Sequence, residues 1–145
     1  RADLTFNNFF IGLAAQKKSI SVFEPGTQLR NLLFIDDAVN ALIASLHCTE
    51  SNDNIYLVAG DQHYTVLQIA SHIAETFDSS VCLQPWPMDR EVTEVGDVVL
   101  DDSRFRFATG WQPAVDFSEG LALTKKYLSD RLDKYLPTRV TGGTI

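Results

Sequence analysis

Two arginines have the residue type and the position that binding an anion would need. Arg30 stands where a Pro25-Gly26 turn leads into an apolar run, and Arg90 comes shortly before Gly96-Asp97. The planar guanidinium group carries paired N–H donors, which match a diphosphate if both arginines turn inward. The alternative is an exposed charge, or an ion pair with one of the 19 acidic residues, and the spacing alone favours this alternative.

No catalytic motif accompanies these arginines. The sequence contains no G-x-G-x-x-G, G-x-x-x-x-G-K-[ST], H-E-x-x-H or G-x-S-x-G pattern. None of the tyrosines is followed four residues later by a lysine that could lower its pKa. The three histidines do not have the spacing of a zinc site. We therefore predict no catalytic residue, no bound cofactor and no metal in this chain.

Composition restricts the kind of partner. The net charge is -7, whereas a nucleic-acid surface needs clustered lysines and arginines. No apolar run approaches the roughly 18 residues of a membrane span, and no signal peptide is recognisable. The two cysteines, Cys48 and Cys82, are typical of reduced thiols in a cytoplasmic protein. Because Arg1 replaces an initiating methionine, we expect a piece of something longer.

The residue pattern predicts one compact α/β unit of short strands and about five helices, which position these residues. The clearest helix starts at a capping box formed by Thr65 and Gln68, and an apolar stripe follows. The tail 137–145 is polar and glycine-rich, and we expect it to be flexible. The expected elements are a helix at 4–17, strands at 20–23 and 30–35, a helix at 36–46, a strand at 54–59, a helix at 65–78, strands at 81–83 and 98–100, a helix at 101–109 that Gly110 ends, and a last helix that Ser118 caps.

Four stretches, taken in order, resemble the C-terminal part of the extended short-chain dehydrogenase/reductases, the NAD-dependent nucleotide-sugar epimerases and dehydratases. These stretches are "SISVFEPGTQLRNLLFIDDAVNALIASL", "NIYLVAGDQHYTVLQIASHIAETF", "PWPMDREVTEVGDVVLDDSRFRFATGWQP" and "FSEGLALTKKYL". The third contains a Gly-Trp-x-Pro ending in which Trp111 looks structural. Asp36 and Asp37 of the first are interpreted as helix-capping residues.

The resemblance implies that the chain is the substrate-binding lobe, at 4–136, of a larger enzyme. In that family the N-terminal half is a Rossmann domain that holds NAD or NADP and the Ser/Thr-Tyr-Lys catalytic set. The missing glycine and Tyr-x-x-x-Lys motifs are then expected, and the lobe alone would be inactive. The implied partners are a nucleoside-diphosphate sugar and the Rossmann half. A homo-oligomer that covers exposed apolar surface is a further expectation, whereas nucleic acid and membrane are not expected.

The resemblance also implies which residues contact the substrate. Arg30 and Arg90 match arginines that contact the diphosphate, and Asp97 matches an acidic residue near the ribose or the diphosphate. Ser21 and Phe23 match strand positions that border the base. Together these residues would hold the nucleotide while the sugar faces the nicotinamide.

Asn8 matches an amide near the diphosphate, and three other positions depart from the family pattern. The family commonly has glycine at Glu24 and aspartate at Asn31. Arg90 is seven residues from Asp97, whereas a two-residue gap separates the corresponding residues in some branches. These departures motivate the alternative that the chain is a noncatalytic binding or interaction domain with the same fold.

Overall fold

The structure is a computed structural model that describes residues 5–49, 53–92 and 94–135, without the side chains of 89, 90 and 133. The predicted tail 137–145 therefore lies outside the described residues. The α/β class is confirmed, and all five predicted helices are present with two additional single-turn helices. The elements are α1 (Phe6–Ala15), β1 (Ile20–Phe23), β2 (Leu29–Asn31), α2 (Ile35–Leu46), β3 (His63–Thr65), α3 (Val66–Phe77), β4 (Val81–Gln84), α4 (Met88–Glu91), α5 (Ser103–Thr109), α6 (Phe117–Ser129) and α7 (Leu132–Tyr135).

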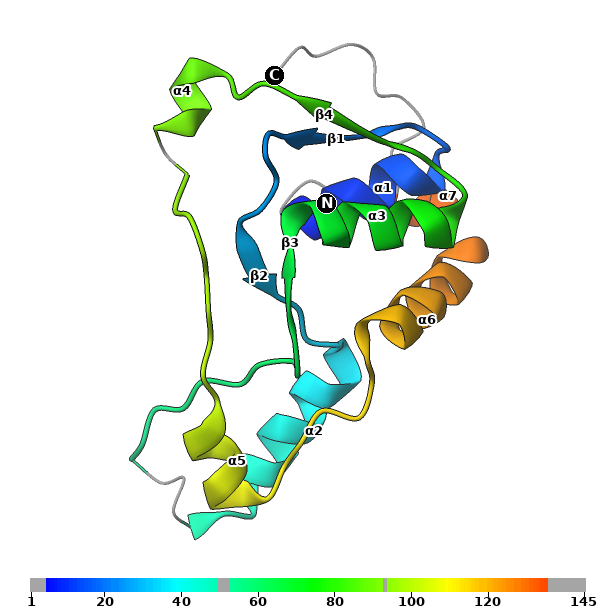
Figure 1. Cartoon of the computed structure of the whole chain (residues 1–145). Helices are drawn as coiled ribbons and strands as arrows, with labels where there is room; N and C mark the ends of the chain where they lie inside the picture. Colours follow the sequence, from blue (N-terminus) through cyan, green and yellow to red (C-terminus); the bar gives the residue numbers. More distant parts are fainter. Residues whose placement is uncertain (1–4, 50–52, 93, 136–145) are drawn as a thin grey trace.

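The strands form two small sheets. β1 and β4 are parallel, with Ile20 opposite Val81 and Phe23 opposite Gln84. β2 and β3 are antiparallel, and Leu29 lies opposite Thr65. Figure 1 shows the β1–β4 pair lying across α1 and α3, while the β2–β3 pair leads away toward α2.

Three predicted strands are corrected by the structure. The segments 54–59 and 98–100 have no regular sheet pairing, although both connect elements of the fold. The strand expected at 30–35 is limited to β2, because Phe34 is already the N-cap of α2. β3 was not expected, since its three residues become a strand only through pairing with β2.

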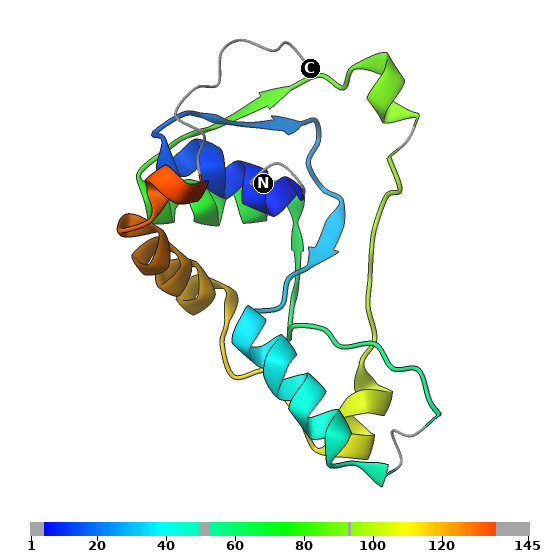
Figure 2. The same cartoon turned by 180° about the vertical axis from the view of Figure 1, so that it is seen from behind.

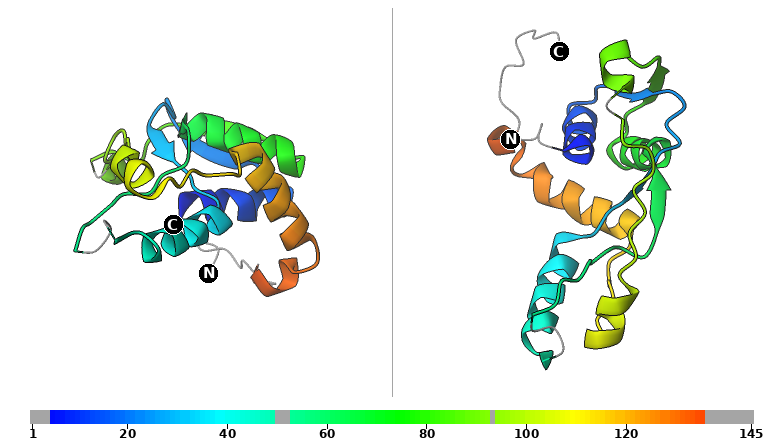
Figure 3. Two further views of the ribbon diagram at one scale, coloured as in Figure 1. Left: turned by 90° about the horizontal axis from the view of Figure 1, so that it is seen from below. Right: turned by 90° about the vertical axis from the view of Figure 1, so that its left-hand side faces the viewer.

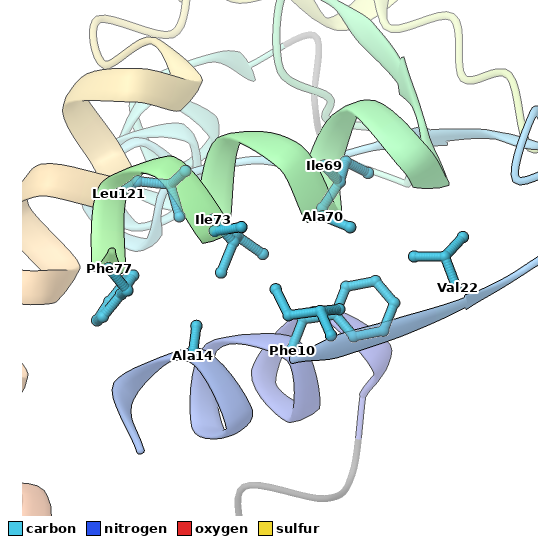
Figure 4. Packing of buried hydrophobic residues seen from close by; sticks show 10 residues of the cluster. Phe10, Ala14, Val22, Ile69, Ala70, Ile73, Phe77 and Leu121 are labelled. Atoms are coloured by element: carbon cyan, nitrogen blue, oxygen red, sulfur yellow. The ribbon is translucent and has the colours of Figure 1, made fainter. Parts of the chain in front are cut away.

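The main hydrophobic core lies between α1, β1, α3 and α6. The stripe predicted on α3 supplies Ile69 and Ile73, both fully buried, and β1 supplies Ile20. Phe10 of α1 and Leu121 of α6 close the cluster from either side (Figure 4). α6 thereby flanks the α1–α3 pair (Figure 2). Burial of such side chains stabilises the fold by about 1.5–3 kcal/mol each.

A second, smaller cluster lies between α2 and α5. Ala41, Phe105 and Trp111 are its buried members. Trp111 retains only 8% of its exposure, which confirms that it is structural. Figure 3 shows α2 and α5 side by side at the end of the molecule away from β1 and β4. The chain therefore has two separate groups of buried side chains.

Asp37 connects α2 to a distant loop and does not cap the helix. Its side chain is 2% exposed, and its two oxygens accept the backbone N–H groups of Ala114 and Val115 at 3.0 Å each. The N-cap residue Phe34 provides no side-chain cap. The capping interpretation is therefore wrong for Asp37, which fixes the chain between α5 and α6 against the start of α2.

Two other helix starts were also predicted. The capping box at α3 is confirmed: Thr65 Oγ1 accepts from Gln68 N at 3.1 Å, and Gln68 Oε1 accepts from Thr65 N at 2.8 Å. The last helix, α6, is capped by Asp116, whose Oδ1 accepts from Glu119 N at 2.8 Å. Ser118, the predicted cap, is the second residue of the helix. An aspartate three residues before Glu119 occupies the N-cap position, so the capping assignment to Ser118 is wrong.

One face of α2 is apolar and exposed. Its side chains there are 45–83% exposed: Ile35, Val39, Leu42, Ile43 and Leu46. Across the described ranges, no helix combines the length and the apolar character needed to cross a membrane. In the same part of the chain, no three histidine, cysteine, aspartate or glutamate side chains gather as a metal site would require.

Candidate functional site

The segment 94–98 is attached along β2, and this attachment brings two predicted site residues together. Leu29 N donates to Asp97 Oδ1 at 2.8 Å, and Val98 N donates to Leu29 O at 2.9 Å. Arg30 is the next residue of β2. These hydrogen bonds bring together residues that are more than 60 positions apart in the sequence. Arg30 and Asp97 both lie next to Leu29.

The guanidinium of Arg30 is half enclosed by this segment. Nη1 donates to Leu29 O at 2.8 Å and to Gly96 O at 2.6 Å. Nη2 donates to Glu94 Oε1 at 2.6 Å. The side chains of Arg30 and Glu94 are only 15% and 25% exposed. Arg30 is therefore not a freely exposed charge, and its ion-pair partner is the Glu94 carboxylate of the 94–98 segment.

Asp97 has a backbone partner. Because Oδ1 accepts from Leu29 N, this carboxylate is held on the edge of β2. Gly96, just before it, has a φ of +70°, the left-handed region that favours glycine. This turn directs the Gly96 carbonyl to Arg30 and the Asp97 carboxylate to Leu29.

Phe23 and Ser21 lie on β1, at and near its carboxyl end. The Phe23 ring packs on Trp86, with ring centroids 4.6 Å apart and planes tilted by 35°. Ser21 Oγ lies 3.4 Å from Cys82 Sγ on the paired strand β4. The hydrogen bond from Ser21, and then one from Ser19, lowers the pKa of the Cys82 thiol from its ordinary value. Neither Cys48 nor Cys82 forms a disulfide.

The other two predicted site residues are not joined to this group by any described contact. Asn8 is exposed in the middle of α1. Arg90 falls within α4, and its side chain lies outside the description. The structure thus brings Arg30 and Asp97 together and pairs Phe23 with Trp86. The binding roles of all six predicted site residues stay predictions.

Two residues of this region were missed from the sequence. Trp86 lies beside two prolines, which indicated only extended backbone. Glu94 stands four residues after Arg90, and its residue type alone did not indicate a partner for Arg30. Its negative charge beside Arg30 is the main departure of this site from the expected one.

The β3–α3 junction does not fit the pyrophosphate of NAD. A dinucleotide pyrophosphate is usually bound by free amides at a helix N-terminus that follows a strand. At the β3–α3 junction these amides already have partners: Val66 N donates to Gln28 O at 3.0 Å, and Leu67 N donates to Gly26 O at 2.9 Å. Gln68 N donates to Thr65 Oγ1. This junction therefore offers no dinucleotide site.

The relatives found by comparison with known proteins are enzymes named for nucleotide sugars. No family model matches the chain. It is 26% identical over 125 residues to UDP-glucuronic acid decarboxylase 3 of Arabidopsis thaliana, covering 86% of this chain and 35% of that protein. It is 26% identical over 128 residues to dTDP-L-rhamnose 4-epimerase of Burkholderia thailandensis, covering 86% and 34%. The chain is similar to the C-terminal part of the extended short-chain dehydrogenase/reductases that act as nucleotide-sugar epimerases and dehydratases.

Solved structures of three enzymes contain the same fold. Epimerase Mth375 of Methanothermobacter thermautotrophicus superposes with a TM-score of 0.80 at 18% identity, covering 90% of this chain and 39% of that one. UDP-glucose 4-epimerase of Thermotoga maritima, solved with UDP-glucose, gives a TM-score of 0.75 at 22% identity, covering 88% and 40%. The enzyme WbmF of Bordetella bronchiseptica, solved with NAD+ and UDP, gives 0.74 at 20% identity, covering 90% and 38%.

The match covers only part of each relative. The chain spans about a third of the length of the curated nucleotide-sugar enzymes it matches. The matched part is their C-terminal lobe. What those enzymes bind and convert is a property of proteins about three times as long as the region they share with this chain.

Proposed function

We propose that the chain is the substrate-binding lobe of an NAD-dependent nucleotide-sugar epimerase or dehydratase. In the intact protein it would hold a nucleoside-diphosphate sugar for hydride transfer to NAD or NADP bound by a Rossmann domain. The observation that carries this proposal is the sequence match across 86% of the chain to two enzymes of different reaction type that share this substrate class. The domain bounds 4–136 belong to the same proposal.

The described residues supply a reason why such a lobe could orient a nucleotide. Arg30 is fixed at the edge of β2 by two backbone carbonyls, so its guanidinium is preorganised for a phosphate oxygen. Phe23 and Trp86 form an aromatic pair at the carboxyl end of the parallel strands. Ligands of α/β folds characteristically bind at that end of the sheet. The contribution of the lobe to catalysis is thus positioning.

Calorimetric titration of the full chain with UDP, dTDP and UDP-glucose tests the proposal. We expect Arg30→Lys, which keeps the charge but loses the planar fork, to weaken binding by about 10-fold or more, since a charge-assisted hydrogen bond contributes about 1.5–3 kcal/mol. Arg131→Lys is the matched control, because Arg131 contacts Tyr127 on α6, away from β2. A folded chain that binds none of the three ligands would contradict the proposal.

A second candidate function is a noncatalytic binding or interaction domain with this fold. The ion pair between Arg30 and Glu94 favours it, because a carboxylate already satisfies the arginine. For this candidate, Arg30→Lys and Arg30→Ala would change no binding of the chain to any nucleotide. The titration above therefore separates the two functions, and the sequence encoded upstream separates them independently through a glycine-rich loop and a Tyr-x-x-x-Lys motif.

A further inference from the structure

The hydrogen bonds of Arg30 differ in how easily a ligand could replace them. The partners of Nη1 are the carbonyl oxygens of Leu29 and Gly96, which belong to the backbone that attaches the 94–98 segment to β2. The partner of Nη2 is the side chain of Glu94, at 2.6 Å. A side chain can leave by rotation, whereas a backbone carbonyl leaves only if the segment detaches. Glu94 is therefore the exchangeable partner of the guanidinium.

Other carboxylates near Arg30 do not compete for this position. Asp97 Oδ1 is held by Leu29 N at 2.8 Å. Glu91, at the end of α4, is exposed. Within the described part of the chain, Glu94 is the carboxylate that forms the ion pair with Arg30. A ligand phosphate that binds Arg30 therefore has to replace the carboxylate of Glu94.

The loop around Glu94 can release this side chain at a limited local cost. Glu94 Oε1 also accepts from Gly96 N, but at 3.2 Å, longer than its contact with Arg30. Glu94 is itself 25% exposed at its side chain, so water can replace the protein around the freed carboxylate and amide. The backbone contacts of Asp97 and Val98 with Leu29 do not involve Glu94 and would persist.

We infer that Glu94 is a specificity-determining residue of the Arg30 site, which disfavours a monophosphate and admits a diphosphate. This inference rests on the function proposed above. A monophosphate exchanges one anion for another at Arg30, with less charge and fewer acceptor oxygens than a diphosphate, and then also faces the displaced carboxylate nearby. A diphosphate brings more charge and more acceptor oxygens, so it gains more from the guanidinium than the carboxylate gave.

The test compares UMP with UDP on the full chain and on Glu94→Gln, which keeps the size and an acceptor oxygen but removes the charge. We expect the wild-type chain to prefer UDP by about 10-fold or more, the size of one charge-assisted contact. We expect Glu94→Gln to tighten UMP by about 10-fold and UDP by less, so that the preference shrinks. Glu91→Gln removes the same charge at an exposed position and is expected to leave both affinities unchanged.

The outcomes separate this inference from the proposed function. If the wild-type chain binds UDP and Glu94→Gln leaves the UMP affinity unchanged or weaker, the role of Glu94 is refuted while the proposed function stands. If no variant binds UDP or UMP, both fail. A second readout is the NMR signal of the Arg30 guanidinium: it should shift in Glu94→Gln without ligand, and UDP should shift it in the wild-type chain. An unshifted signal in the UDP-bound wild-type chain would also refute the exchange.

Discussion

Asn31 forms hydrogen bonds with the backbone of Gly60 through both groups of its side-chain amide. Its Oδ1 accepts from Gly60 N at 2.8 Å, while its Nδ2 donates to Gly60 O at 3.0 Å and to Gln62 O at 3.1 Å. A Cβ on Gly60 would collide with the carbonyl oxygen of Leu32, so the two segments can approach this closely only with glycine there. The side chain of Asn31 thus joins the end of β2 to the segment before β3, where the backbone hydrogen bonds of the sheet have ended.

Asn31→Asp is expected to destabilise the fold. The carboxylate keeps an acceptor for Gly60 N but replaces the donor with an oxygen that faces two carbonyls. We expect a loss of about 1–3 kcal/mol in the free energy of unfolding, measured by urea denaturation. Asn40→Asp, at an exposed position of α2, is the control and should change stability by less than about 0.5 kcal/mol. Equal effects of the two substitutions would show that the Asn31 hydrogen bonds do not stabilise the fold.

Asp37→Ala is expected to be among the most damaging single substitutions. It removes the acceptor of two backbone N–H groups, those of Ala114 and Val115, at a site that is 2% exposed. A buried group left without its partner costs about 1–3 kcal/mol, so we expect a total loss of about 2–5 kcal/mol in chemical denaturation. The neighbouring Asp36→Ala, at an exposed position, should cost far less. A small effect of Asp37→Ala would mean that the loop is held by other contacts.

Gly26→Ala and Gly96→Ala form a matched pair. Both glycines have a φ of +70°, so alanine meets the same backbone strain of about 1–2 kcal/mol at each position. A Cβ on Gly26 would lie 2.8 Å from Val22 Cγ1 and 3.1 Å from Leu67 Cβ, whereas nothing lies within 4 Å of one on Gly96. We expect Gly26→Ala to lower stability in thermal unfolding by about 1–3 kcal/mol more than Gly96→Ala. Equal losses would show that Val22 and Leu67 move aside without cost.

The stability of the fold should decline at alkaline pH through Tyr64. Burial raises the pKa of this phenol above its ordinary value, and the charges of Asp116 and Asp61 raise it further. The unfolded chain therefore loses this proton first, so the contribution of Tyr64 is complete below pH about 10 and is lost as the pH rises above it. Denaturation at a series of pH values from 8 to 11 measures the decline.

Tyr64→Phe is the control for this pH dependence. It should reduce the slope above pH about 10 without changing its sign, because a hydrogen bond with Tyr127 also raises the pKa of Tyr135. The Tyr64 ring packs on Phe117 at 5.0 Å, a contact that phenylalanine can retain. An unchanged slope in Tyr64→Phe would assign the alkaline decline to other groups.

Local signals in the sequence predicted the parts of the fold that depend on local interactions. The capping box of Thr65 and Gln68 spans three residues, and Gly110 ends α5 in the left-handed conformation. The choice of Ser118 over Asp116 failed although the evidence was equally local, because both residue types favour the N-cap and Asp116 stands at the correct distance from Glu119.

Features that depend on distant partners could not be predicted in this way. The segment 54–59 has the apolar composition of a strand, but a strand also needs a hydrogen-bonded neighbour. The ion pair of Arg30 joins residues 64 positions apart. The family pattern placed Arg30 and Asp97 in the same site, and the structure agrees that they are close. The family pattern did not identify Glu94 as the partner of Arg30, because this ion pair depends on how the 94–98 segment is attached along β2.

The separation of the buried side chains into two clusters has a consequence for how the molecule unfolds. The clusters share no buried member, and the two tryptophans of the chain lie in different surroundings. Trp111 belongs to the smaller cluster, while Trp86 stacks on Phe23 of β1. Clusters of unequal size tend to open as separate cooperative units. In a Trp86→Phe chain, whose remaining indole is Trp111, the fluorescence transition should precede the loss of helical circular dichroism as urea increases.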